Sequence, residues 1–144
     1  MRTKIITGLV ILVFIFSGYW LLSPVEYQVP PGYDCLGISV SGVPACKIND
    51  PDTVKSLVKA INSTTFRKRI WSFREAPDNL DAVIQLIDCD TNTSVADVLI
   101  LPSRYGGKTK FIIPYKTDHL IAVDTERLEA CIDSLIGNLI DRVQ

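Results

Sequence analysis

The four cysteines of this chain, Cys35, Cys46, Cys89 and Cys131, are the side chains with the widest choice of chemistry. A cysteine can bind a metal ion, act as a nucleophile or join a second cysteine in a disulfide. Zinc sites of the common kind need closely spaced pairs such as C-x-x-C, and this sequence has none. An even number of well-separated cysteines indicates a disulfide framework outside the cytoplasm. We therefore predict disulfides, and neither a metal site nor a cofactor.

Three pairings of the four cysteines are possible, and local structure favours one of them. Residues 36–48 contain a serine–glycine turn pair and are expected to form a hairpin, which would bring Cys35 close to Cys46. Cys131 falls on the inward face of a predicted helix and could reach Cys89 at the end of a strand. These bridges would close loops of 12 and 43 residues, and would stabilise the fold by roughly 3 and 4 kcal/mol.

His119 is the only histidine, and its presence raises the possibility of a catalytic role for one of the cysteines. A histidine beside a free thiol can act as the base for a cysteine nucleophile. An envelope hydrolase or thiol enzyme that uses a cysteine with His119 is therefore the second functional hypothesis. We assign no catalytic residue, because disulfides would consume the thiols and a histidine at the start of a strand is an ordinary surface residue.

Three carboxylates near Cys89 form another group with possible chemistry. Asp88 and Asp90 flank this cysteine, and Asp97 lies across the next turn. Together they could bind a cation or act as an acid pair. We favour the simpler interpretation, which is the solvated end of a hairpin.

The basic–aromatic cluster is the least ordinary surface feature. It consists of the five residues that we take as the candidate binding surface: Arg67, Arg69, Trp71, Phe73 and Arg74. Arginine beside aromatic residues is enriched at protein-binding surfaces. The cluster could also contact anionic lipid headgroups, or could simply be a charged edge strand that prevents aggregation.

Residues 5–22 form an apolar stretch of 18 residues without a charge. As a helix it would be about 27 Å long, close to the hydrocarbon core of a bilayer, which is about 30 Å thick. Arg2 and Lys4 precede the stretch and no basic residue follows until Lys47, so the positive-inside rule places the N-terminus in the cytoplasm. A cleaved signal peptide has a similar pattern, and cleavage is left open.

The chain thus divides into four predicted segments. These are a cytoplasmic tail (1–4), a transmembrane signal anchor (5–22), a proline-rich spacer (23–34) and an extracytoplasmic domain (35–144). The spacer is expected to stay extended and to lift the domain off the membrane.

Hydrophobic periodicity in residues 35–144 predicts an α+β domain. Residues 51–62 show helical spacing after Asp50, which can cap the helix. Strands are expected over 66–74, 82–89, 95–105, 108–115 and 120–123, and an apolar stripe over 128–143 predicts a second helix. Short connections imply an antiparallel meander sheet. With two helices on one face, the result would be a two-layer sandwich.

Charge narrows the function further. Without Arg2 and Lys4, the exported part has 13 basic and 16 acidic residues, which argues against nucleic-acid binding. The first hypothesis is a single-pass protein of the inner or plasma membrane. Its periplasmic or extracellular domain would bind a protein partner without catalysis, as an inhibitor, an immunity-type protector or an accessory subunit. A third possibility, after the binding module and the thiol enzyme, is a subunit whose anchor helix makes the main contacts. The oligomeric state is left open.

Overall fold

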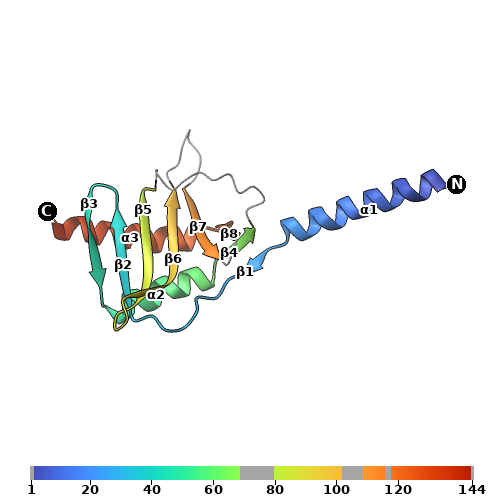
Figure 1. Cartoon of the computed structure of the whole chain (residues 1–144). Coiled ribbons are helices and arrows are strands. Elements are labelled where there is room, and N and C mark those ends of the chain that lie inside the picture. Colours follow the sequence, from blue (N-terminus) through green and yellow to red (C-terminus); the bar gives the residue numbers. More distant parts are fainter. Residues whose placement is uncertain (1, 69–79, 102–108, 116–117, 144) are drawn as a thin grey trace.

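The computed structural model of the chain describes residues 2–68, 80–101, 109–115 and 118–143. These residues form three helices and eight strands (Figure 1). The elements follow in this order: α1 (Arg2–Leu22), β1 (Val25–Glu26), β2 (Cys35–Val40), β3 (Val43–Ile48), α2 (Pro51–Asn62), β4 (Thr65–Lys68), β5 (Ala82–Asp88), β6 (Thr93–Leu101), β7 (Lys110–Tyr115), β8 (Asp118–Ala122) and α3 (Glu126–Val143).

All eight strands belong to one antiparallel sheet with the order β1-β4-β8-β7-β6-β5-β2-β3. The predicted meander is present in β5 to β8, but the sheet as a whole is not a meander. The β2–β3 hairpin adds to one side of it, and β4 with β1 adds to the other. Because α2 connects β3 to β4, the chain crosses from one edge of the sheet to the opposite side through the helical layer (Figure 1).

The two helices of the domain, α2 and α3, cover one face of the sheet, as the sequence predicted (Figure 1). Their apolar stripes pack against the inward side chains of the strands in a single core. The large side chains buried at its centre include Leu57, Ile61, Phe66, Leu86, Phe111 and Leu128. The mixed α+β architecture is therefore confirmed.

Local sequence signals explain where α2 begins and where the first hairpin turns. The Asp50 carboxylate accepts a hydrogen bond from the backbone N–H of Thr53 at 3.0 Å, and Pro51 occupies the first helical position. Gly42 has a φ of 80°, a conformation that residues with a Cβ rarely adopt, and it makes the turn between β2 and β3.

Residues 23–34 are not a free spacer, which corrects the prediction from their prolines. Tyr27 and Val29 are buried in the core at 6% and 9% exposure, and the ring of Tyr27 lies edge-on to Phe66. The Val29 N–H donates to the Asn62 side-chain oxygen at 2.9 Å. These contacts make the segment part of the domain, so only Ser23 and Pro24 separate α1 from β1.

Helix α1 extends away from the domain (Figure 1). Its apolar side chains are exposed to solvent. Ile11, Phe14 and Phe16 have 53%, 74% and 69% of their surface exposed. In the part of the chain that the structure describes, no helix combines the length and the apolarity needed to cross a membrane. The predicted transmembrane helix is thus not supported by this criterion.

Two predicted features lie partly or wholly outside the described residues. The predicted strand over 66–74 is described only as far as Lys68, where β4 ends. Residues 102–108, where the predicted strands over 95–105 and 108–115 meet, are not described, although β6 and β7 pair antiparallel as predicted.

Candidate binding groove

The structure contains one disulfide among the described residues, between Cys35 and Cys89, so both predicted pairings are wrong. Cys35 begins β2 opposite Ile87 of β5, and Cys89 lies just beyond the end of β5. The two Cα atoms are 6.0 Å apart, within the range that a disulfide spans. The bridge thus joins two strands that are neighbours in the sheet but distant in sequence.

Strand alternation explains why the hairpin does not pair Cys35 with Cys46. Cys46 lies opposite Ile38, and Ile38 packs in the core under the helices. Successive side chains of a strand point to opposite faces, so Cys35 is directed to the other face of the sheet from Leu36 and Ile38. The hairpin brings the two backbones together but separates the two sulfur atoms.

The disulfide is held by a small polar network. The Asp34 carboxylate accepts a hydrogen bond from the Cys89 N–H at 2.7 Å, and the Asp34 N–H donates to the Ile87 carbonyl at 3.1 Å. Donor atoms of Asp34, Cys35 and Cys89 lie within 4.8 Å of one another. Because the two sulfur atoms are joined, they offer no thiolate to a metal ion, and this group is structural.

Cys46 and Cys131 are free, half-buried thiols, and both line one groove of about 630 Å³. The groove lies between edge strand β3, the first turns of α2, and α3. From α3, the lining residues recur at helical spacing and comprise Cys131, Ser134, Leu135, Asn138 and Leu139. The groove is thus a gap between the two helices and the edge of the sheet.

The chemistry of the groove is mixed. Ile48, Leu135 and Leu139 give it an apolar floor, whereas serine, threonine and asparagine side chains offer hydrogen bonds. Asp50 and Asp52 line it beside Lys47, so acidic groups outnumber basic ones. Burial raises the pKa of the Cys131 thiol, which keeps this cysteine protonated at neutral pH.

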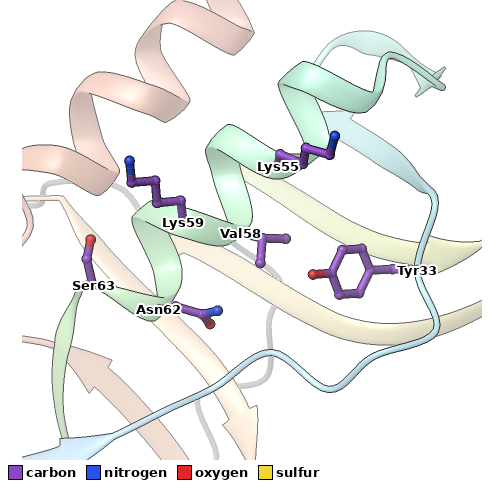
Figure 2. Close-up of a pocket in the computed structure, with 6 residues that line it drawn as sticks. All are labelled: Tyr33, Lys55, Val58, Lys59, Asn62 and Ser63. Carbon is purple, nitrogen blue, oxygen red and sulfur yellow. The ribbon is translucent and has the colours of Figure 1, made fainter.

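A second, more open pocket of about 420 Å³ lies on the other side of α2 (Figure 2). Figure 2 shows the Tyr33 ring, from the segment between β1 and β2, beside Val58. Lys55 and Lys59 add two ammonium groups from successive turns of α2. Asn62 in this pocket already holds the Val29 backbone, so part of its lining serves the fold.

The basic–aromatic cluster is only partly described. Arg67 is exposed on β4, and neighbouring Phe66 is fully buried, which agrees with the predicted alternation of the strand. Arg69, Trp71, Phe73 and Arg74 lie outside the described residues. A role in binding for this surface stays a prediction.

The structure does not bring a free thiol beside His119. This histidine lies on β8, and four strands separate β8 from Cys46 on β3. Leu120 is buried under the helices, so alternation turns His119 to the opposite face of the sheet from α3 and Cys131. The geometry gives the thiol-enzyme hypothesis no catalytic pair.

The acidic group near Cys89 is engaged in turn structure. Asp88 accepts hydrogen bonds from the N–H groups of Asp90 and Thr91 at 3.0 and 3.3 Å, and contacts with Thr91 lower the pKa of its carboxyl. Asp97 accepts from Gln85 and Ser94. These contacts agree with the simpler interpretation of a hairpin end.

The groove was not predicted from the sequence. Its one accessible signal was the small and polar side chains of α3 at positions 131, 134 and 138, which repeat beside the apolar stripe. This pattern does not reveal a groove, because the groove exists only where β3 and the start of α2 meet α3.

No family model, curated protein or solved structure matches this chain at a significant level. Its described residues form an α+β domain with one large antiparallel sheet and one disulfide between neighbouring strands. A groove with both polar and apolar lining lies at the edge of the sheet.

Proposed function

We propose that this protein is a membrane-anchored binding module, and that the groove between β3, α2 and α3 receives a segment of a protein partner. The observation that carries this proposal is the position of the groove. It lies at strand β3, and α1 joins the domain at β1, which is the opposite edge of the sheet (Figure 1). With strands about 4.8 Å apart, β3 lies roughly 34 Å from β1. A domain held by α1 would present the groove outward.

The anchor is supported by the chemistry of α1. Its exposed apolar side chains have no partner surface in the described domain beyond a contact near β4, and burial in lipid would remove them from water. The basic residues Arg2 and Lys4 precede the apolar stretch, which favours a cytoplasmic N-terminus and a periplasmic or extracellular domain. A disulfide in the domain is typical of such an oxidising compartment.

The groove favours a partner segment with basic and hydrogen-bonding side chains. Asp50 and Asp52 give its entrance a negative excess over Lys47, and Ser134 and Asn138 offer polar contacts above the apolar floor. An inhibitor, an immunity-type protector or an accessory subunit would each use such a surface without catalysis.

Capture of crosslinked partners from native membranes tests the proposal. The full chain carries a C-terminal affinity tag on a flexible linker, and Ser134→Trp is compared with Asp133→Trp. Both residues are exposed on α3, but only Ser134 lines the groove. Ser134→Trp should reduce capture of a specific protein at least about tenfold, which corresponds to about 1.4 kcal/mol, and Asp133→Trp should leave it unchanged.

A further variant carries an unrelated membrane anchor in place of residues 1–22. Retained capture is expected, because the contacts belong to the domain. If capture disappears with the exchanged anchor but survives Ser134→Trp, then α1 makes the main contacts and the groove proposal is wrong.

A further inference from the structure

Cys46 and Cys131 line the same groove from two different elements, β3 and α3. Cys46 comes from β3, where it lies opposite Ile38 on the helix-facing side of the sheet, and Cys131 comes from the groove face of α3. Both side chains pack against the same core and are half-buried. Within the described residues they are the two cysteines that the Cys35–Cys89 bridge leaves free.

We propose that Cys46 and Cys131 are a redox pair that forms a second, reversible disulfide across the groove. In the dithiol form the groove is open. In the disulfide form β3 is tied to α3 and the groove is narrowed. The pairing itself does not depend on the proposed binding function, but its effect on partner capture rests on that function.

The two thiols lie on an edge strand and on the last helix of the domain. β3 is an edge strand with β2 as its one neighbour in the sheet, and Cys131 precedes the end of α3 by about three turns. Both side chains line the groove, and a disulfide requires Cα atoms within about 7 Å of each other. The proposed disulfide therefore requires β3 and α3 to move toward each other across the groove.

Oxidised glutathione, or an exposed disulfide of a protein oxidant, can supply the oxidising equivalents. The Cys46 thiolate attacks one sulfur of the oxidant, a mixed disulfide forms, and one thiolate leaves and takes up a proton. The Cys131 thiol then gives its proton to solvent, and its thiolate attacks the Cys46 sulfur and expels the second thiolate, which takes up a proton. Two cysteine thiols are oxidised and one disulfide is reduced to two thiols, so atoms and electrons balance.

Alkylation of the purified full-length protein in glutathione redox buffers tests the pair. After equilibration, free thiols are blocked with N-ethylmaleimide, and the peptides are mapped by mass spectrometry without reduction. A linked Cys46–Cys131 peptide should accumulate as the buffer becomes more oxidising. Its ratio to the blocked peptides should change tenfold for about 30 mV, as expected for a two-electron couple. The Cys35–Cys89 peptide should stay linked throughout.

Single variants provide the matched controls. In Cys46→Ser, Cys131 should be found either alkylated by N-ethylmaleimide or joined to glutathione. In Cys131→Ser, Cys46 should be found increasingly as a mixed disulfide with glutathione. If a variant fails to fold, the peptide map of the wild-type protein still tests the proposal. The proposal would be overturned if both cysteines were still alkylated by N-ethylmaleimide in the most oxidising buffer. It would also be overturned if the two cysteines were linked only between two molecules of the protein.

Partner capture separates this inference from the proposed function. If the disulfide forms and capture falls at least tenfold, both hold. Free thiols in every buffer with normal capture refute the redox pair alone. A linked pair in a protein that captures no partner in either state supports the redox pair and counts against the binding function.

Discussion

Removal of the Cys35–Cys89 bridge provides the sharpest test of the fold. The bridge joins residues 54 apart in sequence, and the chain-entropy relation assigns such a loop about 4 kcal/mol of stabilisation. Cys35 is also fully buried, so its replacement by alanine adds a small cavity cost. We expect each of Cys35→Ala, Cys89→Ala and the double variant to lose about 4 kcal/mol.

The near equality of the three values is the informative part. When two residues share one bond, either substitution removes it, and the second substitution has little left to remove. For a domain of this size, 4 kcal/mol corresponds to a fall in Tm of roughly 15 °C. Urea denaturation followed by circular dichroism gives the free energies, and a thermal scan gives Tm.

Two results would refute this reasoning. Losses that add up in the double variant would mean that Cys35 and Cys89 act independently and are not bonded to each other. A loss below about 1 kcal/mol would mean that the bridge constrains the unfolded chain far less than its loop length implies.

Three further outcomes follow from local contacts. Asp50→Ala should cost about 1 kcal/mol in urea denaturation because it removes the N-cap of α2, and Asp50→Asn, which keeps the cap, should cost less than half of that. Leu57→Ala should cost about 2–5 kcal/mol because Leu57 is fully buried, and a smaller loss would show that the core closes over the space. The Asp88 carboxyl should titrate below its usual pKa of 3.8 in NMR experiments. The folded protein favours the ionised form of Asp88. The carboxylate therefore stabilises the fold above pH 3.8, and this stabilisation is lost as the pH falls through the lowered pKa. Thr91→Val should move that pKa upward, and an unchanged value would exclude the hydroxyl as its cause.

Much of the local structure could be predicted because its signals are local. The Asp50 cap and Pro51 define the start of α2, the turn before Val43 defines the first hairpin, and alternating apolar residues define β5. Of the apolar stripe predicted for α3, Leu128, Ile132, Leu135 and Leu139 are buried, and Cys131 is half-buried. Each of these features depends on contacts within a few residues, which the sequence displays directly.

The candidate site could not be predicted to the same extent. The cysteines were identified from the sequence, but their pairing was not, because proximity along a hairpin does not specify the face on which each sulfur lies. The groove was missed because its walls come from β3, α2 and α3, which no short sequence pattern connects.

The sequence by itself determined α2, α3 and every strand except β1, the helical faces that are buried and the apolar character of α1. Only the tertiary structure decided that residues 23–34 belong to the domain, that Cys35 bonds to Cys89, and that Cys46 and Cys131 share a groove. The physical reason is the same in each case. Periodicity reports which side of an element is apolar, whereas strand order and the crossing of α2 decide which distant elements that side meets.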